Sequence, residues 1–452
     1  MTPSRSTARA GRAAQLQGLL EHLLGAPLPV RLRAWDGSEA GPPGAPVLEV
    51  RDRRALRHLL WRPDELGLAR AWVAGDLDLP PGGDLYAMME SLLPLVEAAR
   101  GSDRPRPRLR EHLGTLLRLG ALGPRPPLPP EEARELTGRR HSLTRDRQAI
   151  RHHYDVGNEF YRLVLGPSLV YSCAYWPPGT PDLESAQANK LDLVCRKLGL
   201  RPGMRLLDVG CGWGSMLLHA ARHYGVHGVG ITLSQEQAAA ARERIAQEGL
   251  ADRLEVRIQD YREVPDGPFD AISSIGMAEH VGAEQYLAYA GKLYDLLAPE
   301  GRLLNHQIAR RPTRPGERYE LSPFIAAYVF PDGELMPIGG TVSLLERAGF
   351  EVRDVEALRE HYAVTLRAWV SNLEADWERA VKLVGRGRAR VWRLYMAASA
   401  VAFESNSIGV NQVLAVRTRD SGRSGMPRSR ACWQPGSDAP SADGASADGP
   451  SV

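Results

Sequence analysis

The sequence predicts an α/β protein whose larger part is an open, mostly parallel, doubly wound sheet, and three observations support this. Between residues 145 and 417, short apolar segments alternate with helical ones, which is the rhythm of βαβ units. One such segment, residues 206–209, runs into the glycine-rich turn Gly210-Cys211-Gly212-Trp213-Gly214, and a helix is expected to begin at Ser215. The 452 residues are also enough for two domains.

Each predicted strand of the larger domain is a short apolar segment bounded by turn residues. The strands are expected at residues 205–209, 226–231, 254–258, 271–275, 301–308, 351–357 and 413–417. Helices are expected between several of them, notably at residues 235–248 and 285–297. We therefore place the larger domain at residues 141–417.

Residues 1–99 are predicted to form a smaller N-terminal α+β domain, with helices at 16–24, 55–60 and 85–99 and a strand at 47–50. Residues 100–140 are rich in proline and arginine, and proline disfavours regular helix. We interpret them as a linker around a short helix at 113–119. Residues 418–452 are rich in Ser, Gly, Asp and Pro, and we expect a disordered tail there.

The composition excludes several function classes. A net charge of +3 is too small to favour nucleic acid as a partner. The four cysteines show no C-x-x-C spacing, so we expect neither a metal site nor a disulfide framework, and a reducing, cytoplasmic compartment. No run of 18 apolar residues and no secretory signal is found in the sequence. Only four basic residues are lysines, which we interpret as codon bias. The arginines of residues 100–125 either belong to a solvated linker or contact an anionic membrane surface.

The glycine-rich turn predicts a nucleoside-like cofactor. Glycine has no Cβ, so Gly210, Gly212 and Gly214 let a ligand approach the backbone closely. The G-x-G-x-G spacing after Asp208 differs from the G-x-G-x-x-G of dinucleotide folds. This form favours S-adenosyl-L-methionine over NAD.

Polar residues after the next two strands complete the predicted cofactor site. A dinucleotide fold places an acidic residue for the ribose at the end of the second strand, but no carboxylate stands there. Thr232 or Gln237 is therefore expected to bind the ribose, unless Glu236 reaches back; a capping box formed by Ser234 and Gln237 is equally compatible. After the third strand, Asp260 can accept from the adenine amino group and Tyr261 can pack on its ring, although Asp260 can also be a simple turn residue.

Several further motifs occur in one order along the chain. They are His152-His153-Tyr154, Tyr171-Ser172-Cys173-Ala174-Tyr175-Trp176, Met277-Ala278-Glu279-His280, Asn305-His306-Gln307-Ile308 and His361-Tyr362. Together with the glycine-rich turn, they resemble the cyclopropane-fatty-acyl-phospholipid synthases and the mycolic acid cyclopropane synthases. The resemblance runs from about Arg151 to Leu414. Residues 73–77 resemble the extra domain of the phospholipid-acting branch.

The resemblance implies a class I methyltransferase with a Rossmann-like doubly wound sheet. It implies transfer of a methylene from S-adenosylmethionine to the cis double bond of unsaturated phospholipid acyl chains, through a carbocation that a bound bicarbonate ion deprotonates. Five positions match the bicarbonate-holding residues of the family: Cys173, Glu279, His306, Ile308 through its backbone, and Tyr362. Tyr171 and Ser172 match residues near the cofactor's tail, and Tyr154, Tyr175 and Trp176 can stabilise a cation.

Each of these residues also has a structural interpretation. Taken singly, Glu279 can start a helix, Cys173 can be a small buried hydrophobic residue, and His306 can be a core histidine. Three other functions stay open: a methylene- or methyl-branched product, a small-molecule N-methyltransferase, and a lipid-binding protein with a vestigial cofactor site. The expected location is the inner membrane surface, reached by transient docking. The first domain either handles lipid or forms a homodimer.

Overall fold

The computed structural model describes residues 11–100, 112–133, 156–314 and 319–433, and single positions between 138 and 148. The chain divides into two compact units, and each combines segments that are distant in sequence. Unit 1 comprises Met1–Arg134, Leu321–Pro331 and Trp377–Val401, and unit 2 comprises Glu135–Glu320, Asp332–Asp376 and Ala402–Val452. Among the described residues, no helix has the length and apolarity needed to cross a membrane.

Unit 2 is built on a seven-stranded sheet with the order β10-β11-β9-β8-β5-β6-β7. Its strands are β5 (Arg205–Val209), β6 (His227–Thr232), β7 (Leu254–Ile258), β8 (Phe269–Ile275), β9 (Leu297–Arg310), β10 (Glu351–Ala357) and β11 (Ile408–Val416). Strand β11 runs antiparallel to both of its neighbours, whereas the pairs from β9 to β7 are parallel. This confirms the mostly parallel sheet that the sequence predicts.

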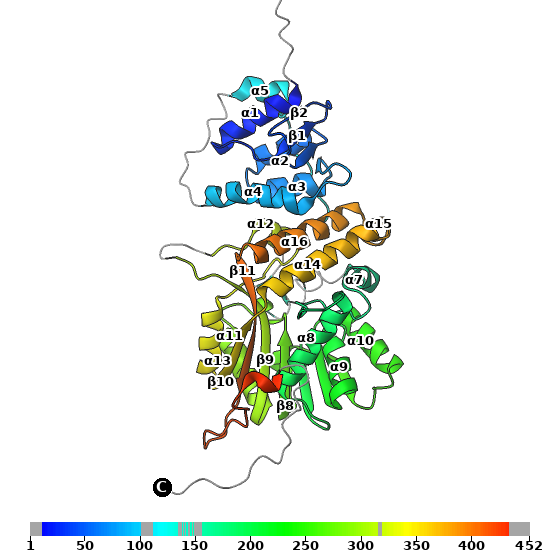
Figure 1. Cartoon of the computed structure of the whole chain (residues 1–452), viewed down its shortest axis with the longest axis vertical. Coiled ribbons are helices and arrows are strands. Elements are labelled where there is room, and N and C mark those ends of the chain that lie inside the picture. The colour runs from blue at the N-terminus through cyan, green and yellow to red at the C-terminus, as the bar shows by residue number, and fades with distance from the viewer. Residues whose placement is uncertain are drawn as a thin grey trace, which may run out of the picture. The chain divides into compact units, whose positions relative to one another are not determined.

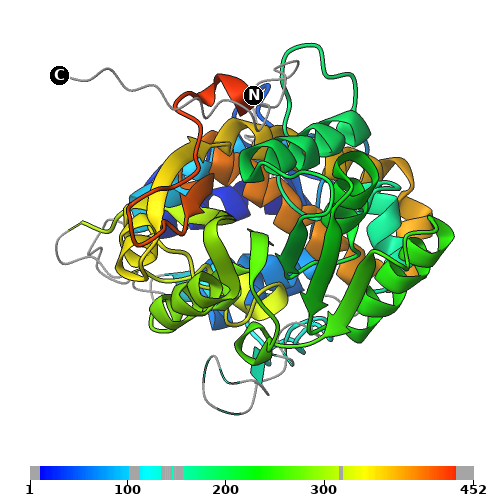
Figure 2. The same ribbon diagram turned by 90° about the horizontal axis from the view of Figure 1, so that it is seen from below.

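Helices cover both faces of this sheet (Figures 1 and 2). They are α7 (Asn158–Leu165), α8 (Leu183–Leu198), α9 (Ser215–Tyr224), α10 (Gln235–Gln247), α11 (Tyr286–Leu296), α13 (Ile338–Arg347) and α14 (Arg359–Ala375), with the short η2 (Tyr261–Glu263), η3 (Ala278–His280) and η4 (Arg430–Trp433). Successive strand residues point to opposite faces. Leu206 accordingly joins the core under α8, α9 and α10, and Leu207 the core under α11 and α13.

Unit 1 is a smaller α+β unit with a four-stranded sheet in the order β2-β1-β3-β4. Its elements are α1 (Arg12–Leu24), β1 (Arg31–Ala34), β2 (Glu39–Ala40), β3 (Val47–Val50), α2 (Arg54–Trp61), α3 (Glu65–Val73), β4 (Leu77–Asp78), α4 (Leu85–Arg100), α5 (Leu113–Arg118), α12 (Pro323–Tyr328), α15 (Trp377–Val384) and most of α16 (Arg386–Glu404). The buried Arg390 joins α16 to the unit, since it pairs with Asp78 at 2.9 Å and donates to the Trp72 carbonyl at 2.6 Å.

The described residues differ in three respects from the predicted domain division. Residues 321–331 and 377–401, expected in the larger domain at 141–417, belong to unit 1, where Arg390 of α16 pairs with Asp78 by tertiary contact. Residues 112–133, expected in a linker, pack into unit 1, where Leu116 and Leu119 are buried and Glu132 pairs with Arg70 at 2.6 Å. Residues 418–433, expected in a disordered tail, are ordered, because Trp433 buries its ring and Arg419 pairs with Glu300 at 2.5 Å. Single apolar residues and ion pairs, rather than a periodic pattern, anchor these segments. The rest of the predicted tail, residues 434–452, lies outside the described residues.

Candidate active site

The glycine-rich turn forms one wall of a pocket at the carboxyl ends of the parallel strands of unit 2. Gly210, Gly212 and Gly214 have φ values of 78°, 53° and 77°, a region that favours glycine. Gly214 is the N-cap residue of α9, so the turn leads directly into the positive end of that helix. A pocket lined by bare backbone beside a helix N-terminus suits a nucleoside-like cofactor.

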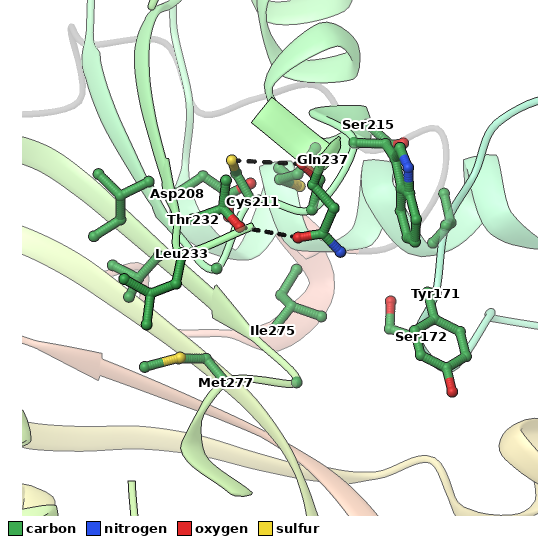
Figure 3. A pocket seen from close by; sticks show the side chains of 18 of the residues that line it. Tyr171, Ser172, Asp208, Cys211, Ser215, Thr232, Leu233, Gln237, Ile275 and Met277 are labelled. Atoms are coloured by element: carbon green, nitrogen blue, oxygen red, sulfur yellow. Dashed lines mark hydrogen bonds between the residues drawn. The ribbon is translucent and has the colours of Figure 1, made fainter. Parts of the chain in front are cut away.

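The pocket collects most of the residues that the sequence predicts for cofactor binding. Its lining includes Tyr171, Ser172, Asp208, Gly210, Gly212, Thr232, Gln237, Asp260 and Tyr261. Figure 3 shows Tyr171 and Ser172 across the pocket from Thr232 and Leu233. The segment before α8 therefore faces the strand ends across this pocket.

Thr232 and Gln237 act together at the end of β6. The Thr232 hydroxyl donates to Gln237 Oε1 over 2.9 Å, a bond drawn in Figure 3. Ser234 caps α10 by accepting from the Gln237 N–H over 3.3 Å. The Ser234 N–H, however, donates to Thr232 Oγ1 instead of the Gln237 side chain. Only half of the predicted capping box forms, and the Gln237 side chain is held at the pocket wall.

Asp260 is engaged by its neighbour Arg262. The Arg262 Nε and Nη2 donate to the two carboxylate oxygens over 2.7 and 2.8 Å, and its backbone N–H donates to Oδ1 as well. Asp260 is thus a turn residue that also lines the pocket. Tyr261 is buried beside it, and burial raises its pKa to about 12.

Two buried charged groups lie at the base of the pocket. Asp208 is 2 % exposed, accepts from the Ser273 hydroxyl over 2.6 Å, and has its pKa raised to about 6 by burial. Lys190, on α8, is 1 % exposed and donates to Ser172 Oγ over 2.9 Å. Burial lowers the Lys190 pKa to about 8. The sequence analysis missed Lys190, although its being one of four lysines was an available signal.

Glu279 is fixed by strand β9. The backbone N–H of Ile308 donates to Glu279 Oε1 over 2.7 Å. Among the described residues, Oε2 is buried without a hydrogen-bond partner. Burial raises the Glu279 pKa to about 7. Ile308 therefore orients the Glu279 carboxyl group and leaves one oxygen available to another group.

Cys173 and Tyr362 meet at the start of α14. The buried Cys173 thiol donates to the Leu358 carbonyl over 3.6 Å, and the Tyr362 N–H donates to the same carbonyl over 3.1 Å. The Leu358 N–H in turn donates to the carbonyl of Val410, which pairs with Ile308 in the sheet. The Cys173 thiol and the Tyr362 backbone thus share one acceptor, and Leu358 links that acceptor to the strand pair that contains Ile308.

His306 lies two residues before Ile308 on β9 and is 2 % exposed. Burial lowers its pKa well below the usual value, so the ring is neutral. Within the described part of the chain, neither ring nitrogen has a hydrogen-bond partner. A core histidine is usually satisfied, so the interpretation of His306 as an ordinary core residue is disfavoured.

Aromatic rings continue from the pocket past these residues. Tyr171 contacts Trp369 with ring centroids 5.4 Å apart, Trp369 contacts Tyr362 at 5.9 Å, and Tyr362 contacts Phe403 at 4.7 Å. Trp176 donates to the Thr365 hydroxyl over 3.0 Å and is held on α14. The predicted His152-His153-Tyr154 motif lies outside the described residues.

Comparisons with known proteins agree with this geometry. Residues 141–413 match the family model described as mycolic acid cyclopropane synthetase. A protein of Mycobacterium tuberculosis named a probable fatty acid methyltransferase is 44 % identical over 411 residues, which is 90 % of this chain and 95 % of that protein. The cyclopropane-fatty-acyl-phospholipid synthase of Escherichia coli is 38 % identical over 270 residues, covering 60 % of this chain and 68 % of that enzyme.

A solved structure gives the same result for the fold. Mycolic acid cyclopropane synthase CmaA1, complexed with SAH and CTAB, is 34 % identical with a TM-score of 0.56, over 60 % of this chain and 97 % of that one. The fold, the pocket and these relatives agree on one type of enzyme. The chain is an S-adenosylmethionine-dependent methyltransferase that belongs to the mycolic acid cyclopropane synthetase family.

Proposed function

We propose that this enzyme transfers a methylene group from S-adenosylmethionine to the cis double bond of unsaturated acyl chains in membrane phospholipids and so forms cyclopropane fatty acids. The observation that carries the proposal is the buried polar set of Glu279, His306, Cys173 and Tyr362 beside the cofactor pocket. Methyl transfer to nitrogen or oxygen releases an N–H or O–H proton that solvent can accept. Ring closure instead removes a proton from a methylated carbon inside an apolar site, so it needs a buried base.

The residues fit a bound bicarbonate ion. Glu279 Oε2 and the two His306 ring nitrogens are buried polar atoms with no partner among the described residues, and such atoms are costly unless a ligand satisfies them. The Cys173 thiol is neutral, since burial raises its pKa. Cys173, Glu279, His306 and Tyr362 would hold the ion, and Ile308 would hold Glu279 in place. A base bound here would accept the proton that leaves the substrate, a step that contributes about 10²–10⁴-fold.

The cofactor pocket performs the first part of the reaction. Bound S-adenosylmethionine supplies the methyl group to the alkene. Gly210, Thr232 and Gln237 line the seat for its nucleoside, and Tyr171 and Ser172 close the opposite side. Methylation leaves a cation on the acyl chain. The aromatic faces of Tyr171, Trp369 and Tyr362 can stabilise it by about 2 kcal/mol in a desolvated site.

The phospholipid substrate is supported by the relatives and by the second unit. The enzyme of Escherichia coli is named for phospholipid-bound acyl chains. The relative from Mycobacterium tuberculosis aligns over 90 % of this chain, so its similarity extends into unit 1. An enzyme acting on membrane lipids from the inner, cytoplasmic side must dock transiently at a membrane surface. Unit 1 is the candidate for that contact or for a homodimer.

The test is incubation of the purified enzyme with S-adenosylmethionine, bicarbonate and a mono-unsaturated phospholipid, followed by mass spectrometry and proton NMR of the lipid. We expect a mass gain of one CH₂ group and strongly shielded ring protons. A mass gain with vinylic protons on a branched carbon would instead show a methylene-branched product. No mass gain with any unsaturated phospholipid would refute the substrate class.

A further inference from the structure

Lys190 carries a buried charge that forms no salt bridge among the described residues. Its ammonium group has three N–H donors, and one of them reaches Ser172 Oγ over 2.9 Å. Among the described residues, no carboxylate oxygen lies within 4.0 Å of Nζ. Asp208 acts on Lys190 electrostatically, but it lies beyond that distance and accepts from the Ser273 hydroxyl. A buried ion with no opposite charge in contact is costly. An anion bound near Lys190 would therefore be strongly stabilised.

Lys197 on the same helix provides an internal comparison. It is as deeply buried as Lys190, but its Nζ pairs with Glu356 and lies 3.4 Å from Asp354. Only four of the 57 basic residues are lysines, so 53 are arginines. Helix α8 thus carries two of the four lysines on its buried side, one in contact with carboxylates and one not.

Lys190 lies at the cofactor pocket and close to residues of the proposed bicarbonate site. It lines the cofactor pocket together with Ser172 and Asp208. Burial raises the pKa of the neighbouring Cys173 thiol, and the Lys190 charge opposes that rise. Burial lowers the pKa of His306, and the Lys190 charge lowers it further. Helix α8 also packs directly on β9, the strand of His306.

We call the proposed bicarbonate site, formed by Cys173, Glu279, His306 and Tyr362, the base site. Binding an anion there calls for a positive charge nearby. Burial raises the pKa of the Cys173 thiol and lowers that of His306, so neither side chain supplies a charge, and Glu279 is an acid. Bicarbonate, which is itself an anion, would lie beside a carboxyl group in a buried site. We propose that the Lys190 ammonium is the counter-charge that allows the base site to bind its anion next to Glu279, an inference that rests on the proposed function.

The test measures anion binding without turnover. Lys190→Met removes the charge and keeps the length of the side chain, and Lys190→Gln keeps a polar contact to Ser172. Lys292→Met is the matched control, because Lys292 donates only to the Val264 carbonyl among the described residues and lies outside the pocket lining. Carbon-13 bicarbonate is titrated into each protein saturated with S-adenosylhomocysteine, and its NMR line width gives the dissociation constant. Calorimetry gives the S-adenosylhomocysteine affinity, and thermal unfolding confirms folding.

We expect the bicarbonate dissociation constant to rise at least about tenfold in both Lys190 variants, equivalent to about 1.4 kcal/mol, and by a larger factor than the S-adenosylhomocysteine dissociation constant. Neither constant should change in Lys292→Met. Unchanged bicarbonate binding in either folded Lys190 variant would overturn the proposal. A loss of S-adenosylhomocysteine affinity with unchanged bicarbonate binding would also overturn it, since Lys190 would then hold the cofactor's carboxylate. Absence of bicarbonate binding in the wild type would refute the base site itself.

Discussion

Replacing Glu279 with glutamine should lower turnover and, at alkaline pH, raise stability. The substitution keeps an oxygen that can accept from the Ile308 N–H, so the local geometry is preserved. It removes the acid that the base site uses, and turnover should fall about 10²–10⁴-fold. Cofactor affinity should stay unchanged, because Glu279 does not line the cofactor pocket.

The stability effect follows from the raised pKa of Glu279, which burial moves from 4.5 to about 7. A carboxyl group with a raised pKa binds its proton more tightly in the folded than in the unfolded state. Its contribution to stability is therefore present at low pH and is lost as the pH rises from 4.5 through 7. Each pKa unit corresponds to about 1.36 kcal/mol, so the loss is at most about 3 kcal/mol. Part of the side chain is accessible to solvent, which makes this an upper value.

Urea unfolding of wild type and Glu279→Gln, followed by circular dichroism, measures this difference. Between about pH 5.5 and about pH 8.5, the variant should gain about 2 kcal/mol on the wild type, or about 2–4 °C in melting temperature. Other titrating groups are the same in both proteins and cancel. A stability difference that does not change with pH would refute the assignment of a raised pKa to Glu279. Wild-type turnover in the variant would refute its catalytic role.

Three further substitutions test other parts of the site. Cys173→Ser should lower turnover about tenfold or more, because the shorter C–O bond withdraws the donor, while calorimetry should show unchanged cofactor affinity; unchanged turnover would contradict its role. Gln237→Ala should weaken cofactor binding about three- to tenfold by removing the partner of Thr232, with kcat nearly unchanged; a fall in kcat alone would contradict this. Gly230→Ala should cost about 1–3 kcal/mol of unfolding free energy, since its Cβ would lie 2.6 Å from Leu217 Cδ1 and 2.9 Å from Cys211 Cβ; a neutral effect in thermal unfolding would contradict the close packing.

Local sequence patterns predicted much of unit 2. Strands β5, β7 and β10 have the predicted bounds, because a short apolar run between turn residues carries its own signal. Strand β9 extends beyond the prediction to Leu297–Arg310, since pairing with β8 and β11 stabilises residues that the pattern leaves ambiguous. Local sequence patterns could not predict that each unit combines separate segments of the chain. The contact between Arg390 and Asp78, for example, forms only in the tertiary structure.

The sequence by itself determined the class of fold, the glycine-rich turn and, through the order of its motifs, the family. Those features are short and contiguous, so residue type and spacing are sufficient to reveal them. Only the tertiary structure decided which side chains share a charge environment. It placed the Ile308 N–H on Glu279, left His306 without a hydrogen-bond partner among the described residues, and buried Lys190 beside Ser172. Burial and electrostatic coupling depend on distances between segments far apart in the chain, and no local pattern encodes them.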